Sequence, residues 1–136
     1  MTPARRTAAS IVRAHIVQSG KALLARRRRG PLERWTTFGG WSEPGESPVE
    51  TLRRELREEL GIQVLKFQRL AVRAATWDGD PAQIAVFAVL DWRCSPRNAA
   101  PDEHEEIAWF TYDQITGLPM HEQARSEALR LLSKNA

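Results

Sequence analysis

The chain has 136 residues, of which 42% are hydrophobic and 27% charged, and its formal net charge is +3. This length suits one domain, residues 1–136, and this composition excludes fibrous and intrinsically disordered proteins. One cysteine, Cys94, permits no internal disulfide, and neither a signal peptide nor a membrane-spanning stretch is recognisable, so we expect a cytoplasmic protein without a membrane partner.

The N-terminal third predicts two strands that form a hairpin. Residues 10–17 are rich in Ile and Val, and residues 21–28 follow after a short turn. The second strand ends in four consecutive arginines, Arg26 to Arg29. Such a run suits a polyphosphate or a solvated strand end, and strand alternation must point some of its members outward. Residues 35–38 then predict a short strand that runs into the paired glycines at 39 and 40.

The clearest helix of the sequence begins after Ser47. Ser47 is a favourable N-cap, Pro48 suits the first helical position, and Glu50 completes a capping box. Gly61 is the expected C-terminal stop. Apolar residues at helical spacing predict one buried stripe, made of Val49, Leu52, Leu56 and Leu60.

The second half of the chain predicts a further hairpin and a closing helix. Residues 64–77 and 84–92 are strand-like and flank the turn Asp78-Gly79-Asp80-Pro81. A loop at 96–101, a short strand at 107–110 and a helix at about 121–133 follow. This order predicts an α/β fold in which a mixed β-sheet packs between helices.

Three acids of the first helix are expected to share one patch. At about 100° per residue, Glu55, Glu58 and Glu59 fall within an arc of about 100°, away from the leucine stripe. Like charges at this spacing repel, and clustered carboxylates suit a hard cation such as Mg2+, which shares its ligands with phosphates. A solvated helix face, with its acids paired to neighbouring arginines, is the alternative that this cluster alone leaves open.

The window Gly40 to Ile62, GWSEPGESPVETLRRELREELGI, decides between the two interpretations. It resembles the signature of the Nudix hydrolase family, whose fixed positions are met by Gly40, Glu46, Arg54, Glu55, Leu56, Glu58, Glu59, Gly61 and Ile62. Nine matches in 23 residues are highly specific. One departure is Phe38, where many members of the family have proline before the paired glycines, and it predicts a different loop shape.

The resemblance implies an α/β/α sandwich and a role for each matching residue. Glu58 and Glu59 would ligate Mg2+, or Mn2+ in its place, and Glu55 would assist as a ligand or base. Arg54 would orient a glutamate through a charge-assisted pair. Gly40 would lie at the metal and the substrate phosphates, and Gly39 at the substrate phosphates. Glu46 would support the loop, and Gly61 would end the helix.

Two further site residues are expected outside this window. Many members of the family use another acid from a later loop, and the stretch 102–106 before Trp109 resembles the subgroup that contains mutator-suppressing nucleoside triphosphate pyrophosphohydrolases. Glu103 is the favoured residue and Glu106 the second choice. Arg27 stands where similar proteins place an arginine that contacts phosphate, and a guanidinium can hold two phosphate oxygens.

The expected activity is the Mg2+-dependent hydrolysis of a (deoxy)nucleoside triphosphate to a monophosphate and pyrophosphate. Metal-bound water would attack phosphorus, and Glu55 or Glu103 would accept its proton. Alternatives are another pyrophosphate substrate (a dinucleoside polyphosphate, a nucleotide sugar, ADP-ribose or an RNA 5′ end) and a non-catalytic nucleotide-binding regulator. A nucleic acid partner is disfavoured because the arginines are interspersed with acids. The sequence leaves open whether the protein forms a homodimer.

Overall fold

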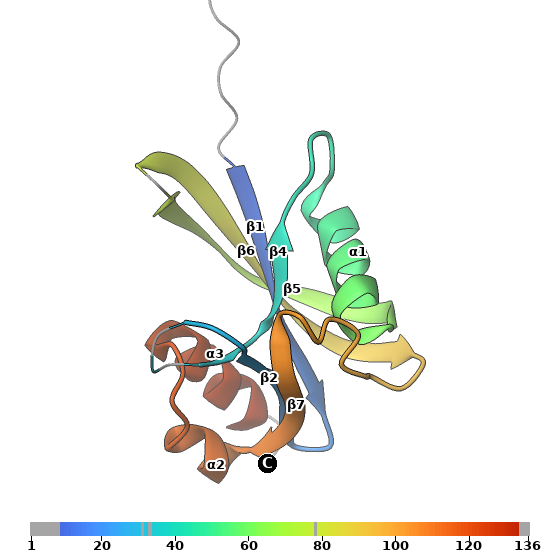
Figure 1. Ribbon diagram of the computed structural model, residues 1–136, viewed down its shortest axis with the longest axis vertical. Coiled ribbons are helices and arrows are strands. Elements are labelled where there is room, and N and C mark those ends of the chain that lie inside the picture. Colours follow the sequence, from blue (N-terminus) through green and yellow to red (C-terminus); the bar gives the residue numbers. More distant parts are fainter. Residues whose placement is uncertain (1–8, 31, 33, 78, 134–136) are drawn as a thin grey trace, which may run out of the picture.

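The computed structural model describes residues 9–30, 32, 34–77 and 79–133, and a mixed sheet forms its centre (Figure 1). Five strands follow the order β3-β2-β1-β6-β5, while β4 also pairs with β1 and β7 with β2. The elements are β1 (Ala9–Gln18), β2 (Lys21–Arg27), β3 (Trp35–Thr36), β4 (Phe38–Trp41), α1 (Pro48–Leu60), β5 (Gln63–Trp77), β6 (Asp80–Arg93), β7 (His104–Thr111), α2 (Tyr112–Thr116) and α3 (Glu122–Ser133).

The predicted α/β fold with a mixed sheet between helices is confirmed. Strands β1 and β6 run parallel, whereas the other pairs are antiparallel. Side chains alternate along β1, so Val12, Ala14 and Ile16 join the core under α1, while Val17 joins the core under α2 and α3. The two helical layers therefore cover opposite faces of the sheet (Figure 1).

Helix α1 has the predicted ends. The Ser47 hydroxyl accepts from the backbone N–H of Glu50, and the Glu50 carboxylate accepts from the backbone N–H of Ser47, which completes the capping box. Gly61 takes the left-handed conformation at φ 68° and its N–H donates to the carbonyl of Arg57. The leucines at 52, 56 and 60 are fully buried, so the stripe fixes which helix face meets the sheet.

The prediction of one short strand at 35–38 was wrong. The segment forms two strands, and the paired glycines lie inside β4, where Gly39 and Gly40 pair with Arg13 and Val12 of β1. A missing side chain does not prevent the ladder, because the pairing uses only the backbone. Phe38, the departure from the family pattern, is fully buried and fills the core under α1.

Three other boundaries differ from the prediction. Strand β6 begins at Asp80, which pairs with Trp77, so the hairpin turn is tighter than expected; Asp78 of the predicted turn lies outside the described residues. Strand β7 begins at His104 because it pairs with the whole length of β2. Helix α2 was not predicted, although Thr111 and Gln114 form its capping box.

None of the helices in the described ranges is long and apolar enough to cross a membrane.

Candidate active site

The acidic face of α1 lies against strand β4. Glu59 is buried, and its Oε2 accepts a hydrogen bond of 2.9 Å from the backbone N–H of Gly39. Glu55 is partly buried against Gly40, where a Cβ would lie 2.6 Å from Glu55 Oε1. Glu58 is different, since 58% of its side chain is exposed. The absence of side chains in the glycine pair therefore lets two of the three acids pack directly on the strand backbone.

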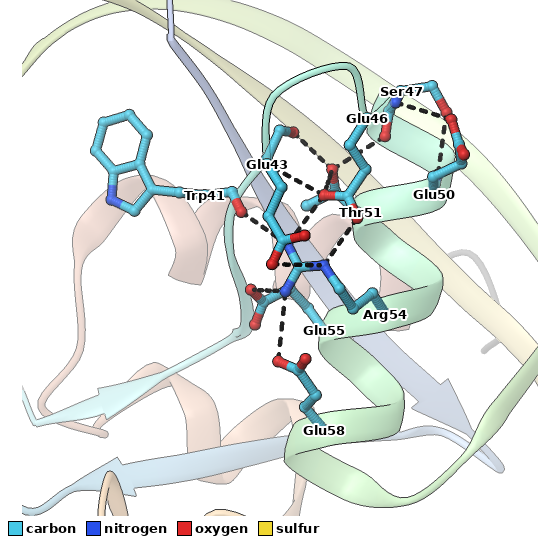
Figure 2. A network of polar contacts seen from close by, with 10 residues as sticks. Trp41, Glu43, Glu46, Ser47, Glu50, Thr51, Arg54, Glu55 and Glu58 are labelled. Atoms are coloured by element: carbon cyan, nitrogen blue, oxygen red, sulfur yellow. Dashed lines mark hydrogen bonds and ion pairs between the residues drawn. The ribbon is translucent and has the colours of Figure 1, made fainter.

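Arg54 links the helix to the loop that precedes it (Figure 2). Its Nε and Nη2 donate to the two carboxylate oxygens of Glu46 at 2.8 and 2.9 Å, a bidentate pair. Its Nη1 donates to Glu55 at 3.0 Å and to Glu58 at 3.4 Å, and Nη2 also reaches the carbonyl of Trp41 at 3.0 Å. One guanidinium thus holds three acids in fixed relative positions.

Glu46 is the centre of the loop's own hydrogen bonds (Figure 2). Besides Arg54, its carboxylate accepts from the backbone N–H of Glu43 at 3.0 Å and from the hydroxyl of Thr51 at 2.8 Å. The hydrogen bond from Arg54 is the main reason that the pKa of Glu46 falls to about 2. Glu46 therefore stays ionised at any physiological pH and acts on the loop and not as a proton carrier.

The segment that carries the later acid is attached to the C-terminal end of α1. The N–H of Arg97 donates to the carbonyl of Leu60 at 3.0 Å, and that of Ala99 to the carbonyl of Glu59 at 2.9 Å. The side-chain amide of Asn98 donates to the carbonyl of His104 at 2.9 Å. Carbonyls at a helix end lack partners within the helix, so these bonds satisfy them and fix the segment beside Glu59.

This attachment brings Glu103 and His104 to the buried acid. Ligand atoms of Glu59, Glu103 and His104 lie within 4.8 Å of one another, and His104 Nε2 is 4.0 Å from Glu59 Oε1. Glu106, the second choice of the sequence, points elsewhere and pairs with Arg26 at 3.2 Å.

The environment of Glu59 fits a divalent cation. Burial raises the pKa of Glu59 to about 8, against the opposing attraction of Arg13. Burial likewise lowers the pKa of His104, which keeps its imidazole neutral. Carboxylate oxygens are the ligands that Mg2+ and Mn2+ prefer, and a cation would offset the cost of keeping Glu59 ionised while buried. The neutral imidazole of His104 adds no positive charge that would oppose the cation.

The raised pKa of Glu59 predicts how stability depends on pH in the metal-free protein. Between about pH 4.5 and about pH 8 the folded state binds more protons at Glu59 than the unfolded state, so the free energy of unfolding falls as pH rises. Each pKa unit corresponds to about 1.4 kcal/mol, so the loss is on the order of a few kcal/mol. We expect urea unfolding in EDTA to show this loss relative to Glu59→Gln, whose side chain does not ionise. Parallel pH profiles for the two proteins would contradict it.

An arginine-lined hollow opens beside these acids. Its volume is about 260 Å³, and Glu59, Glu103 and His104 are among the residues that line it. The predicted Arg27 and further arginines line the same hollow, so cationic and acidic side chains border one space. The lining arginines are Arg13, Arg27, Arg28 and Arg29.

A second hollow adjoins the first on the α3 side of the sheet. Its volume is about 240 Å³, and it shares Arg13, Arg27 and Thr36 with the arginine-lined hollow. Trp35 contributes an aromatic wall, and its ring meets Phe110 edge to face at 4.7 Å. The two hollows are therefore successive parts of one surface depression.

The far wall of the second hollow is polar. Glu127 of α3 accepts from buried His15 at 3.1 Å and pairs with Arg73 of β5 at 3.2 Å. The hydrogen bond from His15 holds the pKa of Glu127 low, although burial acts in the opposite direction. An ionised carboxylate in a fixed position thus faces this hollow beside the aromatic wall.

Sequence reasoning did not select Arg13 or His104 as site residues. The signal for Arg13 was present, because an arginine within the Ile- and Val-rich strand 10–17 must point into one of the two cores. His104 is next to the favoured Glu103, but only the attachment of residues 97–99 to α1 turns its ring toward Glu59.

Comparisons with known proteins agree with this geometry. A model of the NUDIX domain matches residues 4–132. Nucleoside triphosphatase NudI from Enterobacter sp. (strain 638) is 34% identical over 100 residues, which cover 67% of this chain and 71% of NudI. NAD-capped RNA hydrolase NudC from Pseudomonas entomophila (strain L48) is 33% identical over 104 residues, and the chain spans only 37% of the length of NudC.

Two solved structures have a fold similar to that of this chain. The MutT NUDIX hydrolase from Burkholderia pseudomallei superposes with a TM-score of 0.78 at 29% identity, covering 92% of this chain and 98% of that one. The E. coli ORF135 protein superposes with a TM-score of 0.76 at 28% identity, covering 96% and 92% of the two chains. Both likenesses extend over more than nine tenths of each chain.

Proposed function

Because the chain belongs to the Nudix hydrolase family and is a pyrophosphohydrolase, we propose that it hydrolyses a (deoxy)nucleoside triphosphate to the monophosphate and pyrophosphate, with Mg2+ or Mn2+ as cofactor. The observation that carries the proposal is the pair of adjoining hollows. The first offers acids for a cation and arginines for phosphates, and the second offers an aromatic wall and fixed polar groups for a nucleoside. The name of NudI supports the same substrate class.

The acids of α1 would hold the cation. Glu59 is the central ligand in this proposal, joined by partly buried Glu55 and exposed Glu58, while Glu103 and His104 lie alongside. The cation, when bound, neutralises charge on the polyphosphate and lowers the pKa of water. Arg27 and its neighbours bind phosphate oxygens, while Arg54 keeps Glu55 and Glu58 in position.

The proton of the attacking water is assigned to Glu103. Burial raises the pKa of Glu55, but Glu55 is packed against Gly40 and one of its oxygens already accepts a hydrogen bond from Arg54. Glu103 is exposed at the rim of the first hollow, where water reaches it, and its carboxylate is close to Glu59. The attack breaks one phosphate–oxygen–phosphate linkage and releases pyrophosphate and a nucleoside monophosphate.

We expect Glu103→Gln to lower kcat about a hundredfold, the usual contribution of a general base. Glu106→Gln is the matched control, because Glu106 is three residues away and pairs with Arg26. Steady-state kinetics with both variants, together with circular dichroism to verify folding, make the comparison. Near wild-type kcat in Glu103→Gln, or an equal loss in Glu106→Gln, would exclude the assignment.

The substrate class is tested with the purified protein, the eight common (deoxy)nucleoside triphosphates and either metal. Chromatography should detect a nucleoside monophosphate, and a coupled assay should detect pyrophosphate in equal amount. Orthophosphate in place of pyrophosphate would refute the proposed cleavage position. If none of the triphosphates were cleaved while a dinucleoside polyphosphate, a nucleotide sugar or NAD was, the alternative substrates would replace this class.

A further inference from the structure

Arg13 is a partly buried cation at the centre of the sheet. It lies on β1 between Gly39 of β4 and Val86 of β6, its partners across the two ladders. Its Nε donates to the hydroxyl of Thr37 at 3.1 Å, and its Nη2 donates to the hydroxyl of Thr36 at 3.2 Å and to the carbonyl of Thr37. These bonds fix the plane of the guanidinium.

The guanidinium of Arg13 lies at the junction of two hollows. Arg13 lines both the arginine-lined hollow and the hollow that contains Trp35, so it lies where the two meet. These hydrogen bonds engage Nε and Nη2, and Nη1 has no hydrogen-bond acceptor among the described residues. A donor on a fixed guanidinium therefore remains for a group that enters the junction.

The charges around the junction select an anion. Arg13 interacts electrostatically with Glu59, Glu55 and Glu103 on the cation side and with Arg27 beside it. A cation bound among those acids would neutralise them and leave the two arginines uncompensated. Two arginines that line the same junction offer several N–H donors to a phosphate group.

We propose that Arg13, with Arg27, binds the phosphate that stays attached to the nucleoside during cleavage. The inference rests on the proposed function, since it assumes a nucleotide that extends across both hollows. It adds a specificity-determining residue. Because Arg13 lies between the base-binding hollow and the cation, binding of the first phosphate there determines which linkage reaches the cation. The enzyme would then cleave between that phosphate and the next one along the chain. A nucleoside, which has no phosphate, would lack the contact with Arg13 but would keep its contacts in the base-binding hollow.

The experiment measures how much a phosphate adds to binding when Mg2+ is present to neutralise the acids. With Mg2+ in excess, the dissociation constants of the four deoxynucleoside monophosphates and of the matching nucleosides are determined by NMR titration. The phosphate increment is the ratio of the nucleoside constant to the monophosphate constant. We expect an increment of about tenfold or more in the wild-type protein, and an increment several-fold smaller in Arg13→Met, where Arg27 alone remains. Nucleoside binding itself should be unchanged.

Two further variants keep the outcome decisive. Lys66→Met removes one positive charge from exposed β5, away from both hollows, and should leave the increment unchanged. Arg13→Lys keeps the charge but has a single nitrogen, which cannot hold the threonines and a phosphate together, so its increment should fall less than in Arg13→Met. This variant decides the question if Arg13→Met does not fold.

The results separate this inference from the proposed function. An increment that is unchanged in the Arg13 variants, an equal loss of nucleoside and monophosphate binding, or no monophosphate binding in the wild type would overturn the role of Arg13. Triphosphate hydrolysis is measured independently. If the increment depends on Arg13 but no pyrophosphate is released, the inference holds and the proposed activity is wrong. If pyrophosphate is released but the increment does not depend on Arg13, only the inference is wrong.

Discussion

Glu59→Gln should lower turnover by on the order of a thousandfold and weaken metal binding, while leaving the fold intact. The side chain is buried, it accepts from the backbone of Gly39, and it lies next to Glu103 and His104. Gln preserves the shape of the side chain but removes the negative charge that would attract a cation to this buried position. The measurements are steady-state kinetics on the best triphosphate and Mn2+ titration followed by electron paramagnetic resonance.

The control for this prediction is Glu122→Gln. Glu122 is an exposed acid at the start of α3 and pairs with Arg125, so its substitution also removes one charge but touches neither hollow. It should keep full activity and Mn2+ affinity. If Glu59→Gln bound Mn2+ like the wild type, or retained more than a tenth of its turnover, Glu59 would not be a metal ligand.

Gly39→Ala should be the most destabilising single methyl group that can be added at this site. An alanine Cβ would lie 1.9 Å from the carbonyl oxygen of Val12, in a paired strand that cannot move away, and φ is +134°. We expect a loss of roughly 3 kcal/mol or more in the free energy of unfolding, or no soluble protein. Urea denaturation in EDTA measures it.

Gly20→Ala is the matched control for this substitution. Gly20 also has a positive φ, +74°, but a Cβ there would meet nothing within 4 Å. Its cost should be about 1 kcal/mol, from the backbone conformation alone. Equal losses in the two variants would mean that strain of the glycine backbone, and not contact with β1, explains why position 39 needs glycine.

The sequence was sufficient to predict helix α1 because its information is local. The capping box, the glycine at the end and the leucine stripe all lie within residues 47–61, and the family signature, residues 40–62, includes this segment. The long strands β1, β5 and β6 were also recognisable from their composition.

The rest of the site depends on contacts between distant segments. Whether Glu103 or Glu106 faces Glu59 is decided by hydrogen bonds from Arg97 and Ala99 to the end of α1, which no periodicity encodes. The glycine pair was expected to follow a short strand at 35–38, yet it is inside β4 because β1 offers a partner there. The role of Arg13 follows only from the hollows on both sides of it.

The arrangement of the two cores has a consequence for how such a protein can diverge. The acids that would hold the cation and accept the proton belong to α1 and the segment bonded to it, whereas the wall of the second hollow comes from β3 and β5 and from α3, which covers the other face of the sheet. Substitutions in the second group can alter which nucleoside fits without touching the hydrolytic machinery. Selection for a new substrate would therefore act mainly on residues such as Arg73, His121 and Glu127, and one chemistry could serve many metabolites.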